Sequence, residues 1–265
     1  MARMDDGAVK FDPLKLSIIV AAHNEERYIS RCLEAIEQAV EGIEHEVIVI
    51  CDRCTDRTTQ EARRFPVIVI EKDQALWRNS YAENLEIGLK QAHGEFIAVV
   101  DSDIRVEKSY FRKVLAAFDN DIVSVSGKVE TERSTLFNRI YSLWEKTYDT
   151  IGAGREPRGG NRIYRGDILR KVRFSDTIAP DTDVDLRMGG RKIYLREAIS
   201  YHMRELSFGK CIRGQIKSGR ARRQLRIPIW RTILHSLVRL RPFVAIGYIA
   251  EYYVKRTEQI GRHGS

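Results

Sequence analysis

Two aspartates one residue apart, Asp101 and Asp103, directly follow the apolar run 96–100. Side chains on a strand alternate between its two faces, so residues two apart project on the same side where the strand ends. Carboxylate oxygens are hard ligands that suit Mg²⁺ or Mn²⁺, and these ions often bind protein carboxylates and phosphates together. The pair therefore predicts a metal and diphosphate site, although the same spacing also occurs in acidic turns that bind nothing.

The segments around this pair alternate between strand and helix patterns. Apolar runs predict buried strands at 16–22, 46–51, 67–71, 96–100 and 122–126. The spacing of apolar residues predicts helices near 25–40, 80–92, 108–118 and 136–148. Strands that alternate with helices predict a parallel sheet with right-handed connections. Ligands bind at the carboxyl edge of such a sheet, which is where the two aspartates are expected.

Composition predicts a globular chain with one unusually basic region. The 265 residues are 43% hydrophobic, which is enough to bury a full core. The formal net charge is +8, yet residues 204–241 alone contain eleven Lys or Arg and a single acid, Glu205. The rest of the chain is therefore close to neutral. A basic excess confined to one segment predicts a localised anionic partner, either nucleic acid or anionic lipid headgroups.

Several other kinds of site are not expected. Cys51 and Cys54 have C-x-x-C spacing, but no second pair or histidine group accompanies them as a zinc site requires. The G-x-G at 152–154 follows a helical pattern, so we expect a loop there and not a dinucleotide-binding turn. Residues 1–15 lack the apolar core of a signal peptide, which predicts a cytosolic location.

Three turns of the chain resemble those of family-2 inverting nucleotide-sugar glycosyltransferases with a GT-A fold. The first strand ends in Ala21-Ala22-His23-Asn24-Glu25, where that family has a P-x-x-N-E-like turn. The second ends in Cys51-Asp52-Arg53-Cys54-Thr55-Asp56-Arg57-Thr58, where the family has D-D-x-S-x-D-x-T, so both cysteines are departures. The third is the D-x-D pair. The resemblance covers residues 16–224, in a domain expected to span residues 1–224, and implies an α/β, Rossmann-like GT-A fold with a mostly parallel sheet flanked by helices.

The resemblance also implies roles for these turns in the nucleotide-binding half, residues 16–118. Asp52 corresponds to the family's base-binding aspartate, while Asp56 fits ordinary capping of the next helix. The expected nucleotide contacts are Ala21, Ala22, His23, Glu25, Asp52, Asp101 and Ser102. The expected ligands of Mn²⁺ or Mg²⁺ are Asp101, Asp103 and His202.

Residues 119–224 correspond to the acceptor-binding half of the domain. The segment 180–186 resembles the E-D-x-D-L element that carries the catalytic base, and Asp183 aligns with that base although Thr182 replaces the usual glutamate. An inverting transfer needs one such base on the face opposite the leaving nucleoside diphosphate. The segment 159–165 resembles the acceptor side. The residues expected at the diphosphate or acceptor are Lys217, Arg220, Arg222, Arg223 and Asn161. The basic residues among them also fit a solvated or lipid-facing helix.

Residues 225–265 are predicted to form a basic, amphipathic helical appendage. Apolar residues recur at helical spacing from Ile229 to Leu240, with Arg231 and Arg239 between them. Such a helix can lie in a membrane interface, or it can pack its apolar face on the domain. The uncharged stretch 243–250 is too short to span a bilayer. We expect the protein on the cytoplasmic side of a membrane, held peripherally or anchored through a part beyond this sequence.

Together these features predict a metal-dependent inverting glycosyltransferase that moves a hexose to a lipid-linked acceptor. The resemblance to dolichol-phosphate and lipid-linked mannosyltransferases favours GDP-mannose as donor, with a lipid-linked glycan or polyprenyl phosphate as acceptor. The alternatives are a UDP-sugar donor, a sugar nucleotidyltransferase, which would need a G-x-G-T-R-like first turn, and a non-enzymatic nucleic-acid-binding protein. No nucleic-acid partner is expected, because the basic segment carries an apolar stripe and lacks a recognisable binding motif.

Overall fold

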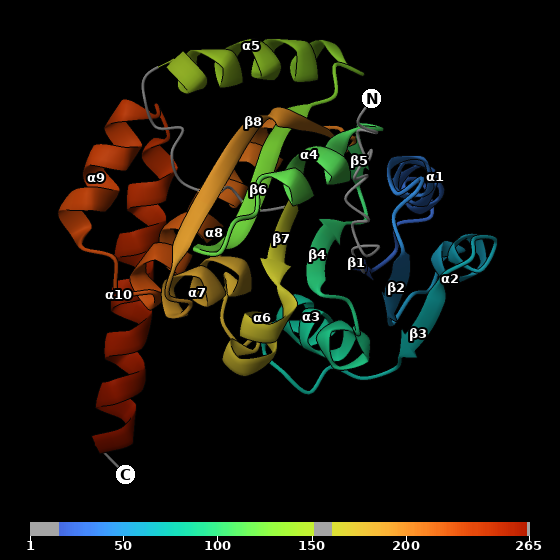
Figure 1. Ribbon diagram of the computed structural model, residues 1–265. Coiled ribbons are helices and arrows are strands. Elements are labelled where there is room, and N and C mark those ends of the chain that lie inside the picture. Colours follow the sequence, from blue (N-terminus) through green and yellow to red (C-terminus); the bar gives the residue numbers. More distant parts are fainter. Residues whose placement is uncertain (1–15, 151–160, 264–265) are drawn as a thin grey trace, which may run out of the picture.

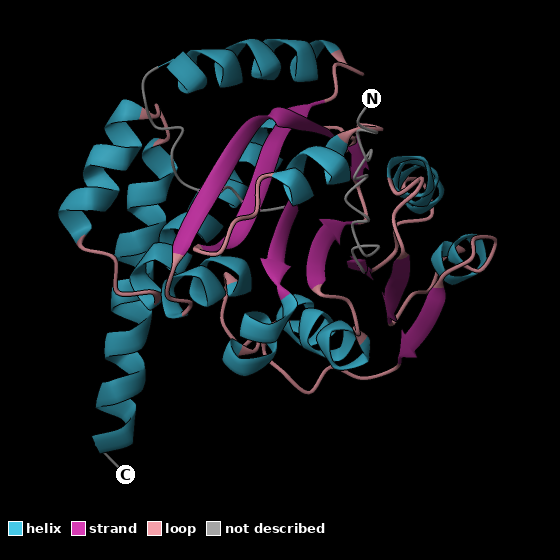
Figure 2. Cartoon of the chain, viewed as in Figure 1, coloured by secondary structure: helices cyan, strands magenta, loops and turns pink. Residues whose placement is uncertain are grey.

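The computed structural model describes residues 16–150 and 161–263 (Figures 1 and 2). The predictions for residues 1–15 and for the loop at 152–160 lie outside these ranges. The strands are β1 (Leu16–Ala22), β2 (His45–Asp52), β3 (Ile68–Lys72), β4 (Phe96–Asp101), β5 (Ile104–Val106), β6 (Ile122–Thr131), β7 (Asn161–Arg165) and β8 (Arg191–His202). They form one sheet in the order β3-β2-β1-β4-β7-β6-β8-β5.

Helices flank this sheet on both faces, as alternating strand and helix patterns predict (Figure 2). The helices are α1 (Ile29–Ala39), α2 (Thr58–Ala62), α3 (Ser80–Gln91), α4 (Tyr110–Ala116), α5 (Leu136–Thr150), α6 (Gly166–Val172), α7 (Pro180–Arg187), α8 (Phe208–Gln224), α9 (Ile229–Val238) and α10 (Pro242–His263). None of the helices in the described ranges is both long enough and apolar enough to cross a lipid bilayer.

The half of the sheet that carries the paired aspartates is parallel. β1 pairs in parallel with β2 on one side and with β4 on the other, and Ala21 lies in register with Asp101. The carboxyl ends of these three strands therefore meet at one edge. Among the described strands, antiparallel pairs occur only after β4, where β7 runs against β4 and β6, and β5 runs against β8. The predicted α/β fold is confirmed, with the antiparallel pairs confined to the second half of the sheet.

Alternate residues of the central strands fill two cores, one on each face of the sheet. Ile18 of β1 packs in the same core as Leu33 of α1, whereas Ile19 packs in the other core with Leu85 of α3. Each of these side chains is at most 2% exposed. Burial on both faces explains why the strands are continuous apolar runs and do not alternate with polar residues.

The helices α8, α9 and α10 lie together beside the second half of the sheet (Figure 1). α8 and α10 approach so closely that a Cβ atom on Gly219 would lie 2.0 Å from the carbonyl oxygen of Val244. A Cβ atom on Gly247 would lie 2.2 Å from the carbonyl oxygen of Ile216. Only glycine fits such a backbone contact, so these two residues fix where the helices cross.

Candidate active site

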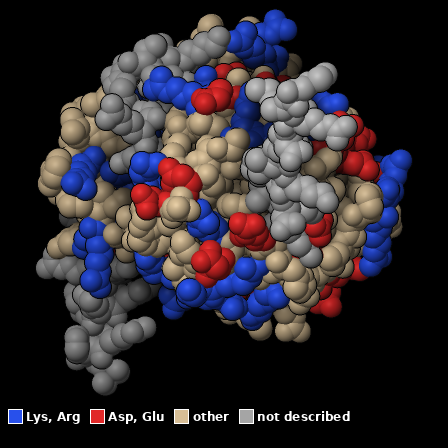
Figure 3. Space-filling model, viewed as in Figure 1, with Lys and Arg blue, Asp and Glu red and all other residues tan. Residues whose placement is uncertain are grey.

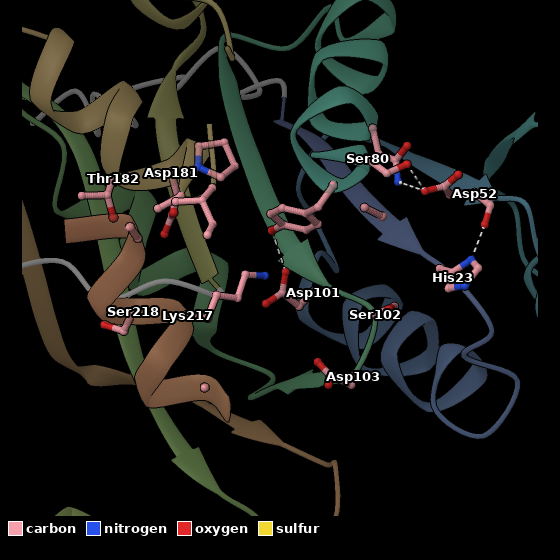
Figure 4. Close-up of a pocket in the computed structure, with 18 of the residues that line it drawn as sticks. His23, Asp52, Ser80, Asp101, Ser102, Asp103, Asp181, Thr182, Lys217 and Ser218 are labelled. Atoms are coloured by element: carbon pink, nitrogen blue, oxygen red, sulfur yellow. Dashed lines mark hydrogen bonds between the residues drawn. The ribbon is translucent and has the colours of Figure 1, made fainter. Parts of the chain in front are cut away.

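A cleft of about 760 Å³ opens at the carboxyl ends of β1, β2 and β4 (Figure 4). The starts of α3 and α7 and one side of α8 form its other walls. The predicted site residues that line it are Ala21, Ala22, His23, Glu25, Asp52, Asp101, Ser102, Asp103, His202, Lys217 and Arg222. The fold thus brings the three predicted turns together with residues from the C-terminal third of the chain.

Asp52 ends β2 at one end of the cleft, where its side chain is only 4% exposed. Its carboxylate accepts hydrogen bonds from Arg53 Nε at 2.8 Å, Ser80 Oγ at 2.5 Å and Asn84 Nδ2 at 3.2 Å. Lys72 Nζ lies 3.4 Å away. Burial opposes ionisation, but these donors and the Lys72 charge hold the pKa of Asp52 well below its usual range. The carboxylate is therefore ionised and surrounded by protein donors.

The first turn after β1 is tied to the turn after β2. His23 Nδ1 donates to the backbone carbonyl of Asp52 at 2.6 Å, and the backbone N–H of Glu25 donates to Thr58 Oγ1 at 2.6 Å. Asp56 accepts from the backbone N–H of Thr58 at 2.9 Å, at the start of α2. This contact agrees with the capping role predicted for Asp56. The two turns form one unit at the end of the cleft that Asp52 lines.

Asp101 and Asp103 both lie in the cleft, at the end of β4 and just before β5 (Figure 4). Asp101 Oδ1 accepts from Tyr81 OH at 2.7 Å, while burial and the nearby Asp103 raise the pKa of Asp101 to about 7. Asp103 Oδ2 accepts from Arg204 Nε at 2.7 Å and lies 3.3 Å from His202 Nε2. The structure therefore places the three predicted metal ligands along one wall and adds a cation, Arg204, beside them.

These residues fit a divalent cation that is held jointly with ligand oxygens. In the described ranges, no group of three or more His, Cys, Asp or Glu side chains is arranged to enclose a metal by itself. Carboxylate oxygens and an imidazole nitrogen are nevertheless donors that Mn²⁺ accepts. Burial lowers the pKa of His202, which favours the neutral imidazole that binds metals. Arg204, which also forms an ion pair with Glu25, neutralises Asp103 in this structure.

The first turn of α7 presents a different carboxylate to the cleft from the one predicted. Asp181 and Thr182 line the cleft (Figure 4), whereas Asp183 does not. Asp183 Oδ2 accepts from Ser175 Oγ at 2.5 Å and from Arg187 Nε at 2.8 Å. Residues two apart on a helix are separated by about 200° around its axis, so they face nearly opposite ways. The structure does not bring the predicted base Asp183 into the cleft, and Asp181 lines the cleft in its place.

The basic residues predicted near the diphosphate separate into two groups. Lys217 and Arg222 line the cleft from α8. Arg220 is exposed outside the cleft lining, and the Arg223 guanidinium lies over two tyrosine rings of α10, 5.7 and 5.1 Å from their centroids. Asn161 begins β7, where its buried amide has no hydrogen-bond partner within the described residues. The placement of Arg220, Arg223 and Asn161 does not support their predicted contacts with a ligand.

Several residues of the cleft were not identified from the sequence. They are Arg53, Ser80, Tyr81, Asn84, Asp181 and Arg204. Ser80 and Asn84 are four residues apart in a predicted helix and so share a face, which was the available signal. Arg204 follows β8 and reaches Asp103 only through the tertiary fold, so no local pattern identifies it.

Comparisons with known proteins place this geometry in a family. The sequence profile described as Glycosyl transferase family 2 matches residues 17–201. A dolichol-phosphate mannosyltransferase from Pyrococcus furiosus is 27% identical over 111 residues, which are 40% of this chain and 31% of that protein. The matched part of the chain thus spans about a third of the length of this curated relative.

Solved structures share the fold over most of the chain. The mannosyltransferase PcManGT from Pyrobaculum calidifontis, in complex with GDP-Man and Mn²⁺, has a TM-score of 0.62 and 19% identity, covering 90% of this chain and 75% of its own. Glucosyl-3-phosphoglycerate synthase from Mycobacterium tuberculosis, in complex with Mn²⁺, UDP-glucose and phosphoglyceric acid, has a TM-score of 0.60 and 18% identity, covering 80% and 78%. The GT-A fold predicted from the sequence is confirmed by these similarities.

Proposed function

The chain belongs to glycosyl transferase family 2, and on that premise we propose that it is a metal-dependent inverting glycosyltransferase that uses a nucleotide sugar. One observation carries the proposal: the pair Asp101 and Asp103 lies on one wall of the cleft and Asp181 lines the same cleft from α7. The pair suits the diphosphate side of a donor, and Asp181 suits the side from which an acceptor approaches. Family membership favours this activity over a sugar nucleotidyltransferase.

In the proposed reaction the acceptor oxygen forms a bond to C1 of the sugar while the bond from C1 to the diphosphate oxygen breaks. Asp181 takes the proton of an acceptor hydroxyl as the new bond forms. Arg162 stabilises the first turn of α7, because its Nη1 donates to the backbone carbonyl of Asp181 at 3.0 Å. If the acceptor is a phosphate, its oxygen is already largely ionised near neutral pH, and Asp181 then orients the acceptor.

The leaving diphosphate gains negative charge as the bond breaks, and cations stabilise that charge. Lys217 and Arg222 line the cleft on α8 and supply this positive charge from the protein. A divalent cation bound by Asp101, Asp103 and His202 would supply more of it. This arrangement explains why both acidic and basic residues converge on one cleft.

GDP-mannose is our first choice of donor, and a lipid-linked glycan or polyprenyl phosphate our first choice of acceptor. The mannosyltransferase relatives support this choice, since one is named for dolichol phosphate and another is solved with GDP-Man. A UDP-sugar is the second candidate, because the other structural neighbour is solved with UDP-glucose.

The surface of α9 supports a location at a membrane. The helix buries the polar side chains of Thr232 and Ser236, while Trp230, Leu234 and Leu237 are 60%, 55% and 69% exposed. An amphipathic helix that packs on a domain normally buries its apolar face and exposes its polar residues. In this structure the apolar face of α9 is the exposed one. The exposed apolar residues of this surface are Ile229, Trp230, Ile233, Leu234, Leu237, Val238 and Leu240, with Ile246 and Ile249 of α10.

Basic residues accompany this apolar surface. Arg226 and Arg231 are exposed beside it, and Figure 3 shows Lys and Arg among otherwise uncharged surface on the side where α9 lies. Each basic residue near an anionic bilayer adds about 1 kcal/mol of attraction, while the apolar side chains enter the interface. We therefore propose that α9 rests on the anionic cytoplasmic leaflet of a membrane, close to a lipid-linked acceptor.

Calorimetric titration of the chain with GDP and with UDP, each with and without Mn²⁺, tests the proposed donor site. Binding of GDP that requires Mn²⁺ supports a GDP-sugar, and binding of UDP alone retains the enzyme while replacing the sugar nucleotide. If neither nucleotide binds with Mn²⁺ present, the assignment of the cleft to a nucleotide sugar is wrong.

A further inference from the structure

Arg53 has a strained backbone at the nucleotide end of the cleft. Its φ angle is 48°, in the left-handed region that a residue with a Cβ atom seldom adopts. The conformation is held by its backbone N–H, which donates to the carbonyl of Lys72 at 2.7 Å. Strain of this kind often marks a residue whose position matters for function. Here it places the Arg53 side chain in the lining of the cleft.

The Arg53 guanidinium is oriented from one side only. Its Nε donates to Asp52 Oδ1 at 2.8 Å, and its Nη2 donates to Asp52 Oδ2 at 3.3 Å and to Ser80 Oγ at 3.2 Å. Nη1 makes no hydrogen bond to any described residue, and the side chain is 43% exposed. A guanidinium has five N–H donors in a fixed plane, so both N–H groups of Nη1 remain available to a ligand.

Asp52, by contrast, has little capacity left for a ligand. Its two oxygens already contact Arg53, Lys72, Ser80 and Asn84, and its side chain is 4% exposed. A carboxylate has about four acceptor positions. Figure 4 shows Asp52 turned toward Ser80, with His23 bonded to its backbone. At this end of the cleft Arg53 therefore offers donors that have no partner among the described residues, whereas the oxygens of Asp52 are already occupied.

We propose that Arg53 determines the choice of nucleobase and that Asp52 positions it. This inference rests on the proposed nucleotide-sugar activity and assigns the base contact within that site. The free Nη1 donors bind a carbonyl oxygen of the base, such as O6 of guanine or O4 of uracil. Arginine also pairs with guanine O6 and N7 in nucleic-acid recognition, where the geometry of the fork matches two acceptors.

Recognition of a carbonyl oxygen by Arg53 should exclude adenine nucleotides. Adenine carries an amino group where guanine carries O6, so a donor would face a donor of Arg53 at that position, and only N7 would remain as an acceptor on that edge. The cleft should therefore bind diphosphates of carbonyl-bearing bases, guanine or uracil, and discriminate against ADP. A stacking contact between Arg53 and the base would be tolerant of all bases and would not discriminate in this way.

The test measures calorimetric affinities of the whole chain, with Mn²⁺, for three ligands. They are the better-bound of GDP and UDP, its analogue that lacks the base carbonyl (2-aminopurine riboside diphosphate for GDP, pyrimidin-2-one riboside diphosphate for UDP), and ADP. For the unchanged chain we expect the analogue and ADP to bind about 10- to 100-fold more weakly. The Arg53→Ala variant should bind the natural nucleotide only as tightly as it binds the analogue. Its affinity for the analogue should be nearly the same as that of the unchanged chain.

Two further variants separate recognition from folding. Arg53→Lys keeps the charge beside Asp52 but loses the planar fork, and it should lose most of the discrimination with an unchanged thermal unfolding midpoint. Arg57→Ala removes an arginine of the same turn that is exposed, pairs with Glu26 and lies outside the cleft lining, so it should bind as the unchanged chain does.

Equal losses for the natural nucleotide and the analogue in Arg53→Ala would overturn the proposal, as would tight binding of ADP to the unchanged chain. Either result leaves the proposed function intact, because a nucleotide still binds. Failure of the unchanged chain to bind GDP or UDP would instead reject the nucleotide-sugar site and this inference together.

Discussion

The crossing of α8 and α10 gives a quantitative test of how the cleft is held together. In Gly219→Ala the new Cβ atom would lie 2.0 Å from the backbone oxygen of Val244 and 2.7 Å from the backbone nitrogen of Tyr248. Backbone atoms cannot rotate away, so the helices must separate by about 1 Å to bring the first contact to 3.0 Å. Overpacking of this kind costs about 1–3 kcal/mol, against a gain of about 0.5–1 kcal/mol from replacing a helical glycine.

Gly214→Ala is the matched control, because it lies on the same helix and its added Cβ atom would meet nothing within 4 Å. Urea unfolding should show the Gly219 variant less stable by about 1–2 kcal/mol, a fall of roughly 0.5–1 M in the midpoint. The Gly214 variant should be slightly more stable than the unchanged chain. Equal or greater stability of the Gly219 variant would refute the close crossing and, with it, the placement of Lys217 and Arg222 that depends on α8.

Three other perturbations test separate parts of the molecule. Burial opposes ionisation of Glu46, but hydrogen bonds from Ser17 Oγ at 2.6 Å and the His93 N–H at 2.7 Å lower its pKa below the ordinary 4.5. A carboxyl group whose pKa is lowered in the folded state stabilises that state above about pH 4.5, and this stabilisation is lost as the pH falls. Glu46→Gln should therefore cost about 1–2 kcal/mol at pH 7, with a difference from the unchanged chain that shrinks below pH 4 in urea unfolding. A difference independent of pH would contradict this account. Asp103→Asn should abolish the effect of Mn²⁺ on nucleotide binding, and an undiminished effect would remove Asp103 from the metal site. Trp230→Ser with Leu237→Ser should reduce flotation on anionic vesicles, whereas Leu76→Ser, an 83% exposed control, should not; equal flotation would exclude α9 as the membrane contact.

Local patterns in the sequence were sufficient to place the paired aspartates at the edge of the sheet. A buried parallel strand must be a continuous apolar run, so the residues that follow such runs lie at the edge where ligands bind. This reasoning predicted Asp101 and Asp103 at that edge, and the family resemblance added Asp52; all three line one cleft. His202 is the last residue of β8 and comes beside Asp103 because β8 pairs with β5.

The acceptor side was less predictable, because it depends on rotation and packing of helices. Asp181 and Asp183 are the same type of residue in the same helical turn. The start of α7 at Pro180 decides which of them faces the cleft. The periodicity of α9 correctly predicted an amphipathic helix, but a period does not tell which face is buried. Thr232 and Ser236 on the buried face show that the apolar face points outward.

Arg204 makes its contacts across the fold and not within its own segment of the chain. It bonds to Asp103 and forms an ion pair with Glu25, which precede it by 101 and 179 residues. Neither partner lies in a local motif with Arg204: the pairing of β5 with β8 brings Asp103 beside it, and the position of the turn after β1 adds Glu25. Long-range ion pairs of this kind become visible only in the folded chain.

The most direct measurement compares sugar transfer by Asp181→Asn and Asp183→Asn. The donor is the sugar nucleotide identified by calorimetry, and the acceptors are a polyprenyl phosphate and a lipid extract containing hydroxyl acceptors. With a hydroxyl acceptor, loss of the base should slow transfer by Asp181→Asn by about 100-fold or more, while nucleotide affinity stays unchanged. Asp183→Asn, which alters a contact with Ser175 and Arg187 outside the cleft, should retain transfer within a few fold. Full transfer by Asp181→Asn together with loss of transfer by Asp183→Asn would contradict the assignment of the acceptor side.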